Sequence, residues 1–412
     1  MANVSSSNGL EKRPKLRFPG FAEPWRSTLL SSVFAKNTRK NTDGQVTNVI
    51  CNSAKQGLIP QREYFDKDIA NSENTSGYYI IEENDFVYNP RKSADAPYGP
   101  ISSYKYAEAG IVSPLYLCFR AKKEINPAFF EWYFRSSAWH RYVYMSGDSG
   151  ARHDRVSIKD DTFFSMPINL PSSHEQKHIA SFLERIDRRI EMQRALVENL
   201  KKYKRGLISE ILKQKIVITH EGENWEEVSL SEVAEGFEYG MNASATSYDG
   251  EHKYIRITDI DDDSHTYIDR DPVSPSGVLE EKYRVREDDI LFARTGASVG
   301  KSYLYQKTDG DLFFAGFLIR IHVKEGVDSE YVFLNTLTEE YDKWVLLESA
   351  RSGQPGINAE QYRQYRFKLP SLGTQKRIAA IARKFDAQIQ KETLCLRRLQ
   401  EQRHGLLQQL FI

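Results

Sequence analysis

A heptad pattern that occurs twice limits the possible folds of this chain more than any other feature. Across residues 170–214, apolar residues recur at alternating spacings of four and three, as in a helix that buries one stripe against a partner helix. The pattern returns 199 residues later, and eight of the ten stripe positions are apolar in each copy. We call this stripe the seam. The predicted seam residues are Ile179, Leu183, Ile186, Ile190, Val197, Leu200, Leu207 and Ile211, then Ile378, Phe385, Ile389, Leu396, Leu399, Leu406 and Leu410. The eighth apolar position of the second copy is the small residue Ala382.

Residues outside the apolar seam also agree between the two copies. A Leu-Pro-Ser sequence precedes each helix, and polar residues interrupt both seams at the same two places. Gln193 and Lys204 in the first copy correspond to Glu392 and Arg403 in the second. These polar residues either fix the register of the helices or lie exposed where the helices splay apart. The sequence therefore predicts an internal duplication in which each copy ends in a long helix.

The connections between the copies predict how the two helices pair. One helix cannot bury such a stripe alone, and its own copy is the nearest partner. The intervening segment leaves from the end of the first helix and returns to the start of the second. Because connections in proteins are short, a compact domain there brings the second helix back beside the first. We expect an antiparallel coiled coil with a pseudo-twofold axis.

The duplication also includes the start of each globular part, since the residues from Trp25 resemble those from Trp225. Short β-like runs bounded by Gly, Pro, Asn and Asp alternate with helical patches. The expected fold class is mixed α+β, with two α/β domains that alternate with two long helices. The predicted boundaries are 1–24 for an N-terminal tail, 25–171 for the first domain, 172–215 for the central helix, 216–371 for the second domain and 372–412 for the C-terminal helix. The tail is expected to be mobile up to about residue 20.

The start of each long helix carries capping residues. Ser172 is expected to act as an N-cap, and Glu175 stands three residues later, which is the spacing of a capping box. The second copy has Ser371 and Thr374 at these places, so its cap is expected to be weaker.

Charge is distributed unevenly although the net charge is zero. Residues 173–215 and 374–412 each carry a net charge of +5. Residues 216–373 carry 16 Lys and Arg against 30 Asp and Glu, a net charge of −14. This acidity argues against a second domain that holds a polyanion by charge alone.

Two observations concern the cellular compartment. The sequence has no run of 18 apolar residues, and its first twenty residues lack an apolar core, so neither a membrane span nor secretion is expected. Cys51, Cys118 and Cys395 show no paired spacing, which predicts free thiols in the cytoplasm.

Two catalytic motifs occur in isolated or incomplete form. Residues His174 to His178 match the His-Glu-x-x-His string of zinc metalloproteases, but the repeat copy has neither histidine nor glutamate, so we interpret them as solvated first-turn residues. Residues Gly296 to Ser302 are one residue short of a phosphate-binding loop, and a strand-like run follows where a helix is required. We therefore expect no catalytic residue, no metal ligand and no enzymatic activity.

Polar loops occupy equivalent places in the two domains, each after a strand-like run and again before the long helix. Arg and Gln can make bidentate contacts to guanine and adenine, and Lys, Ser and Thr suit phosphates or base edges. We expect the turn at 294–301 to present its polar side chains outward. The alternative is that these are ordinary solvated loop residues. The candidate DNA-binding residues are Asn89, Arg91, Lys92, Ser93, Tyr98, Arg152 and Arg155 in the first domain, and Arg294, Thr295, Ser298, Lys301, Arg351, Ser352, Gln354 and Asn358 in the second.

Taken together, two diverged domains alternating with two repeated helices resemble the specificity subunit of type I restriction-modification systems. The resemblance covers nearly the whole chain. It rests on RFPGF before the first domain, GYYIIEENDFVYNP and GIVSPLYLCF within it, ILFARTGASVGK in the second, and Leu-Pro-Ser with Gln, Ile and Asp at each helix start. The second helix departs from the family, because it has LPSLGTQ where an acidic residue usually precedes the glutamine, and because Ala382 thins its seam.

The resemblance implies a function without catalysis. Each domain would read one half of an asymmetric, bipartite double-stranded DNA target, and the helix pair would be the ruler that sets the gap. Two methyltransferase subunits would dock on the helices and bring S-adenosylmethionine, and restriction subunits would bring ATP and Mg. This chain would need no cofactor. The alternative is a non-enzymatic coiled-coil scaffold with two domains that bind ligands other than DNA.

Overall fold

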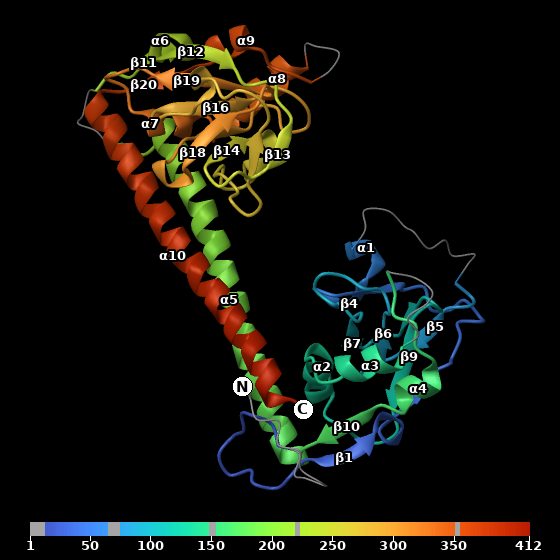
Figure 1. The fold of residues 1–412 in the computed structure, drawn as a ribbon. Coiled ribbons are helices and arrows are strands. Elements are labelled where there is room, and N and C mark those ends of the chain that lie inside the picture. The colour runs from blue at the N-terminus through green and yellow to red at the C-terminus, as the bar shows by residue number, and fades with distance from the viewer. Residues whose placement is uncertain (1–12, 65–74, 148–153, 219–222, 351–354) are drawn as a thin grey trace. The chain divides into compact units, whose positions relative to one another are not determined.

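The computed structural model describes residues 13–64, 75–147, 154–218, 223–350 and 355–412 (Figure 1). The chain divides into two compact units. Unit 1 contains residues 1–193 and 395–412, and unit 2 contains residues 194–394. Each unit therefore combines one globular domain with parts of both long helices, α5 (Ser173–Leu212) and α10 (Leu372–Leu410). None of the helices in the described residues is long and apolar enough to cross a membrane.

Unit 1 is built around a four-stranded antiparallel sheet of order β2-β9-β6-β7. Its strands are β2 (Phe34–Lys36), β9 (Leu117–Ala121), β6 (Phe86–Tyr88) and β7 (Ile101–Ser103). Three antiparallel pairs complete the strands: β1 (Arg26–Leu29) with β10 (Pro167–Leu170), β3 (Ile50–Ser53) with β4 (Gly57–Pro60), and β5 (Tyr79–Ile81) with β8 (Gly110–Val112). The helices of the globular domain are α1 (Gln61–Tyr64), α2 (Pro127–Arg135), α3 (His140–Ser146) and α4 (Asp160–Phe164).

The helical patch after β9 forms two helices because a polar residue interrupts it. The Asn126 side chain caps α2 by accepting a hydrogen bond from the Phe129 N–H (3.1 Å), and Pro127 occupies the first turn, where a missing N–H costs nothing. The helix ends at Ser136, whose backbone is extended. Its aromatic residues, including Phe129, are buried in the main core of unit 1.

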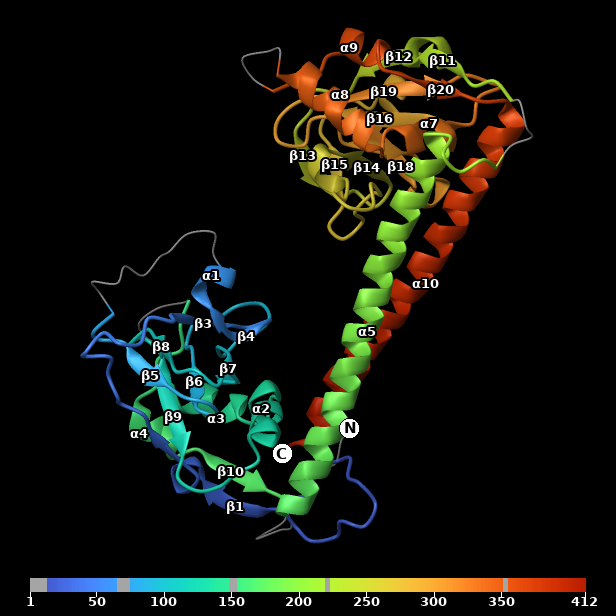
Figure 2. The same cartoon turned by 180° about the vertical axis from the view of Figure 1, so that it is seen from behind.

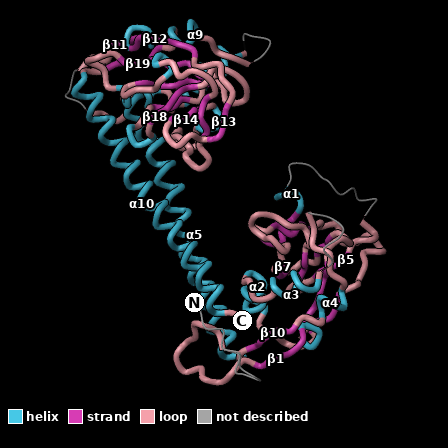
Figure 3. Tube along the Cα trace, in the orientation of Figure 1, coloured by secondary structure: helices cyan, strands magenta, loops and turns pink. Residues whose placement is uncertain are grey.

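Unit 2 repeats the same sheet order with β12 (Ala234–Tyr239), β19 (Leu318–Val323), β16 (Asp289–Ala293) and β17 (Ser302–Leu304). It also repeats the terminal pair, as β11 (Glu226–Ser229) with β20 (Arg366–Leu369). The other pairs are β13 (Ala245–Ser247) with β15 (Val273–Pro275), and β14 (His252–Ile255) with β18 (Asp311–Phe314), which is parallel. Loops surround β13 and β14 (Figure 3). The short helices are α6 (Leu230–Val233), α7 (Ser329–Asn335), α8 (Glu339–Ser349) and α9 (Ala359–Arg363).

A buried aspartate occupies the same place in both sheets but has different partners. In unit 1 the Arg120 guanidinium donates to both carboxylate oxygens of Asp85, at 2.6 and 2.7 Å. In unit 2 the corresponding Asp289 lies 2.9 Å from Nδ1 of His322, and burial raises the pKa of this aspartate. The sheet is therefore duplicated, while the side chains that contact its buried carboxylate have diverged.

The long helices pair antiparallel within each unit, as the sequence predicts. In unit 1, Ile179 and Leu183 near the start of α5 share one apolar core with Leu407 and Leu410 near the end of α10. In unit 2, Ile208 and Ile211 near the end of α5 share a core with Ile378 and Ala382 near the start of α10. Figures 1 and 2 both show the first turns of α10 beside the last turns of α5.

The predicted seam residues are all buried or half-buried. Two further residues, Ile208 (4% exposed) and Leu407 (9% exposed), are buried although they lie one position outside the predicted seam. They are 199 residues apart and belong to the cores of the two units. At these places each helix faces the globular domain as well as its partner helix, so the buried surface is wider than a coiled-coil stripe.

The same interhelical ion pair occurs once in each unit. The ammonium of Lys204 lies 2.6 Å from both carboxylate oxygens of Asp386, and Arg403 pairs with Asp187. Lys204 and Arg403 are equivalent in the repeat, and so are the two aspartates. For Lys204 and Arg403 the structure supports the possibility that polar seam residues bridge the helices and fix their register. The side chain of Glu392 accepts a hydrogen bond from Gln388 on the same helix (2.6 Å).

We expect charge reversal at Lys204 to be rescued by reversal at its partner. Lys204→Asp places two carboxylates together and should destabilise the helix pair of unit 2, whereas adding Asp386→Lys should restore it. A double-mutant cycle in urea should give a coupling free energy of about 1 kcal/mol. Independent effects of the two substitutions would show that the pair does not stabilise the register.

The two helix starts are held by glutamates from different places. The Ser172 hydroxyl accepts a hydrogen bond from the Glu175 N–H (3.2 Å), as expected of an N-cap. The prediction of a full capping box is wrong, because both carboxylate oxygens of Glu175 bind Arg17, at 2.7 and 2.8 Å. A charged guanidinium is a stronger donor than a backbone N–H. At the second helix, Glu223 accepts from the Ser371 N–H (2.9 Å) and the Thr374 hydroxyl (2.8 Å), which the sequence did not indicate.

The described part of the N-terminal tail packs on unit 1, in contrast to the mobile tail expected. The Leu16 N–H donates to the Gln409 carbonyl (3.0 Å), and the Phe18 ring packs edge-on against Phe182 (5.3 Å between centroids). Together with Arg17, these residues connect the tail to both long helices.

Candidate nucleic-acid interface

The backbone of unit 1 brings its two candidate loops together. The first loop follows the end of β6 and contains the candidates from Asn89 to Tyr98. The second loop precedes α4 and contains Arg155. Arg91 and Arg155 form an antiparallel β-bridge. The Lys92 N–H donates to the Asp154 carbonyl (2.8 Å), and the Val156 N–H donates to the Pro90 carbonyl (2.9 Å). The basic candidates Arg91, Lys92 and Arg155 therefore lie on two loops that backbone hydrogen bonds hold together.

Unit 2 repeats this connection at the equivalent place. Thr295, which corresponds to Arg91, forms an antiparallel bridge with Gly356, and the Ile357 N–H donates to the Arg294 carbonyl (2.9 Å). Segments about 60 residues apart in sequence are thus held together in both copies. In the sequence these loops align one by one between the two copies, and in the structure they form pairs.

The side chains of the first loop pair divide into exposed and structural groups. Arg91, Lys92 and Ser93 are exposed. Asn89 shapes the loop, because its side-chain amide donates to the Asn52 carbonyl (3.2 Å) and its carbonyl oxygen accepts from the Arg91 N–H (3.1 Å). The ring of Tyr98 is half-buried and packs on His140, with 4.7 Å between ring centroids. Arg155 is half-buried, and Arg152 lies outside the described residues.

The candidates of unit 2 are less exposed than expected. Arg294 donates from Nε to the Gly316 carbonyl (3.1 Å), and its guanidinium lies 5.0 Å from the ring centre of Tyr239. Tyr239 is a possible interface residue that the sequence did not indicate, because it comes from a distant strand. Thr295 and Ser298 are half-buried.

Two further candidates of unit 2 have structural roles. The expectation that Lys301 points outward is wrong, because its side chain is 10% exposed and its ammonium donates to the Ile260 carbonyl (3.0 Å) and pairs with Asp262. The Asn358 side chain caps α9 by accepting from the Gln361 N–H (2.9 Å). Arg351, Ser352 and Gln354 lie outside the described residues.

The isolated His-Glu-x-x-His motif has a local structural explanation. Glu175, the glutamate of the His-Glu-x-x-His string, is 1% exposed and bound by Arg17, so it is not placed to activate water. The imidazoles of His174 and His178 pack edge-to-face, 4.5 Å apart, with Phe21 beside both. In the part of the chain that the structure describes, no group of three His, Cys, Asp or Glu side chains is arranged to hold a metal ion.

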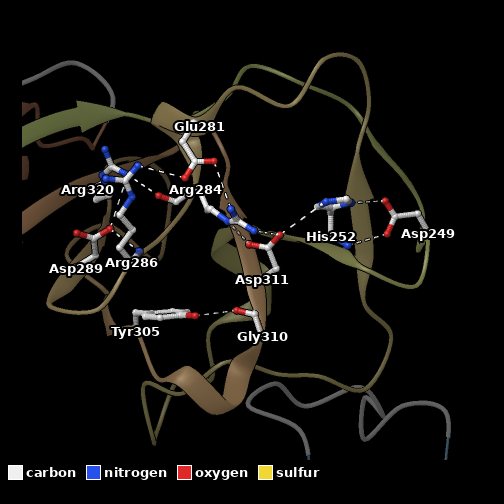
Figure 4. Close-up of polar contacts among 10 residues, drawn as sticks. All are labelled: Asp249, His252, Glu281, Arg284, Arg286, Asp289, Tyr305, Gly310, Asp311 and Arg320. Atoms are coloured by element: carbon white, nitrogen blue, oxygen red, sulfur yellow. Dashed lines mark hydrogen bonds and ion pairs between the residues drawn. The ribbon is translucent and has the colours of Figure 1, made fainter.

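The acidic surface of unit 2 includes a network of paired charges (Figure 4). Asp249 lies 3.0 Å from Nδ1 of His252, whose other ring nitrogen lies 3.8 Å from Asp311. The guanidinium of Arg284 donates to both oxygens of Asp311, at 2.5 and 2.8 Å. Arg284 also forms an ion pair with Glu281. Part of the negative charge of this unit is thus compensated locally, which the charge count alone does not indicate.

This network predicts a measurable titration at His252. Its hydrogen bond to Asp249 raises the pKa of His252, and backbone N–H donors hold the pKa of Asp249 below its usual range. The contribution of His252 to stability is present below about pH 6.5 and is lost as the pH rises through its raised pKa. That of Asp249 is present above about pH 4 and is lost as the pH falls through its lowered pKa. The pair should therefore stabilise unit 2 most between about pH 4 and 6.5.

NMR titration tests this expectation. Asp249→Asn should lower the pKa of His252, while His265, whose own pKa is lowered by burial, should titrate as before. An unchanged pKa at His252 would show that the ion pair does not form in solution.

Comparison with known proteins gives one family. The family model described as type I restriction modification DNA specificity domain matches residues 31–202 and again residues 222–396. Each match spans one globular domain and much of the long helix that follows it. The specificity subunit of the type I restriction enzyme StySPI from Salmonella potsdam is 25% identical over 276 residues. That alignment covers 63% of this chain and 58% of the relative, so it spans little more than half of the relative's length.

Two solved structures share the fold. A chain described under complex assembly and conformational transition of the type I R-M system is 18% identical, with a TM-score of 0.60 over 96% of this chain and 99% of that one. The S subunit of a type I restriction-modification system from M. genitalium is 15% identical, with a TM-score of 0.51 over 97% of this chain and 99% of that one. At these identities the likeness shows the architecture alone.

Proposed function

This chain belongs to the family of type I restriction-modification DNA specificity domains, and from that premise we propose that it is a DNA-reading specificity subunit. Each unit recognises one half of a bipartite, asymmetric double-stranded target. The helix pair sets the unread gap between the halves. The chain itself supplies recognition, and partner subunits supply the chemistry.

One observation supports this proposal above the others. Both units hold a pair of polar loops together through a backbone bridge at the same place in the fold, between Arg91 and Arg155 and between Thr295 and Gly356. A loop whose backbone is bridged to a neighbouring loop presents its side chains to a base edge with less loss of conformational entropy. The scaffold alternative gives no reason for the loop pair to be retained in two domains whose strand pairs outside the shared sheet and the terminal pair have diverged.

A surface on α5 suits a protein partner. Leu196 (42% exposed) and Tyr203 (62% exposed) line a shallow groove of about 730 Å³ together with Leu200 and Leu207. We propose that methyltransferase subunits dock on the helix pair and bring S-adenosylmethionine to adenine. Restriction subunits would then join the complex with ATP and Mg.

Adenine methylation provides the direct test. The chain is co-expressed with the methyltransferase in a host that lacks such methylation, and modified adenines in the host DNA are mapped by sequencing. A split motif with one methylated adenine in each half and a fixed gap supports the proposal. A stable complex of the two proteins without any such motif would favour the scaffold alternative.

Single arginine substitutions should affect one half-site only. Arg91→Ala should relax the sequence preference in the half read by unit 1, and Arg294→Ala should do so in the half read by unit 2. A lost bidentate base contact costs about 1–3 kcal/mol, which is roughly tenfold or more in discrimination. The exposed Arg26 on β1 is a matched control, since Arg26→Ala should change neither half. If either loop variant weakens both halves equally, that arginine contacts phosphate or supports folding instead. Arg152 and Arg351 are candidates for the same test.

A further inference from the structure

An exposed apolar side chain occupies the same turn in both units. Leu115 lies two residues before β9, and Phe317 lies immediately before β19, the equivalent central strand. Aligned through their pairing with β6 and β16, the two residues are counterparts. Each side chain is 60% exposed. Single exposed apolar residues are common on proteins, but two at equivalent positions in otherwise diverged loops call for a shared reason.

The backbone of each turn is fixed. In unit 1, the Ser113 carbonyl accepts from the Tyr116 N–H (3.0 Å), and the Ser113 hydroxyl accepts from the Leu115 N–H (3.3 Å). In unit 2, the Ala315 carbonyl accepts from the Leu318 N–H (2.8 Å). The apolar side chains are therefore presented from ordered turns.

Both turns lie next to the candidate loops. In unit 2 the contact is direct, because the Arg294 N–H donates to the Phe317 carbonyl (3.1 Å). In unit 1, Leu117 at the start of β9 pairs with Tyr88 at the end of β6, and the candidate loop begins at the next residue. Each turn thus lies beside an arginine-bearing loop, where a bound duplex would exclude water from the exposed apolar side chain.

We propose that Leu115 and Phe317 make the apolar base contact of each reader, one in each half-site. The inference rests on the proposed function. Leucine and phenylalanine insert between base steps in many DNA complexes, and apolar side chains also pack on the thymine methyl group. Both modes of contact, insertion between base steps and packing on the thymine methyl group, use an apolar surface of a base. Phe317 offers the larger stacking area, because its side chain is a flat aromatic ring.

The test uses the full chain in complex with its methyltransferase, on duplexes that carry the mapped target. Phe317→Ala should weaken binding about tenfold, and the weakening should map to the half-site of unit 2. Leu115→Ala should act on the other half only. Val278→Ala, at a residue 82% exposed outside these turns, is the matched control and should have no effect. Equal melting temperatures confirm that the exposed substitutions leave the fold intact.

Two DNA probes separate the two sources of contact. With 2-aminopurine at a base step, fluorescence should rise on binding if the side chain unstacks the step, and Phe317→Ala should abolish that rise in its own half-site. With deoxyuridine in place of thymidine, a methyl contact predicts that the base change and Phe317→Ala weaken binding non-additively. Either result supports the inference.

Two results would overturn it. In one, both alanine variants bind and methylate the target as the wild type does, with unchanged responses to both probes. In the other, the variants lose the methyltransferase subunit from the complex, which would make these turns protein contacts. Failure of the proposed function is distinct, because the wild-type chain would then yield no bipartite motif at all.

Discussion

Phe411→Ala is expected to destabilise unit 1 by about 3–5 kcal/mol, the usual cost of removing a buried phenylalanine ring. Phe411 is 5% exposed, and its ring lies 5.6 Å from that of Phe129 and 6.1 Å from that of Tyr133, both on α2. The lost ring would leave a cavity that these neighbours cannot fill without moving. Hydrogen exchange followed by mass spectrometry should show faster exchange across unit 1 and unchanged exchange in unit 2.

The exposed Leu394 on α10 provides the control for this substitution. It is 46% exposed, so Leu394→Ala should change the stability of the chain by less than about 0.5 kcal/mol. If Phe411→Ala speeds amide hydrogen exchange equally in both units, this would contradict the structure, in which each unit has its own apolar core.

Arg17→Met is expected to cost about 3 kcal/mol, because it leaves a buried carboxylate without its partner. Side-chain exposure is 13% for Arg17 and 1% for Glu175, and two hydrogen bonds join them. The double variant Arg17→Met with Glu175→Gln should recover most of this loss, since no charge then remains buried. Urea denaturation of the three variants measures the free energies. A single variant as stable as the wild type would mean that water reaches Glu175 once the arginine is gone.

The periodic parts of this chain could be predicted from its sequence, and the physical reason is that a helix seam is a local signal. A seam requires apolar residues at two positions in every seven. The 33 residues from Ile179 to Ile211 therefore contain the same helical pattern several times. The antiparallel pairing followed from connectivity. The ion pairs of Lys204 and Arg403 were one of two open possibilities, and coordinates were needed to choose between them.

The sheets and the loop geometry were less predictable because their contacts are not local. The central strands have only three to six residues, and β14 pairs in parallel with β18 although 55 residues separate them. Lys301 illustrates the same limit. Its place in a Gly-rich turn indicated an outward side chain, while its actual partner, the Ile260 carbonyl, is 41 residues away in sequence. Side-chain direction in a loop depends on such distant partners.

Unit 1 is built from two segments that are far apart in the sequence, and this has a consequence for biosynthesis. Its core includes Leu407, Leu410 and Phe411, which are translated only after the whole of unit 2. At about 5–20 residues per second, on the order of 10–40 s pass between the emergence of Gln193 and that of Cys395 from the ribosome. During that interval Ile179 and Leu183 lack the helix that covers them. An apolar surface exposed for that long is open to a neighbouring nascent chain on the same polysome, so slower translation of unit 2 is expected to favour pairing of the helices between two chains.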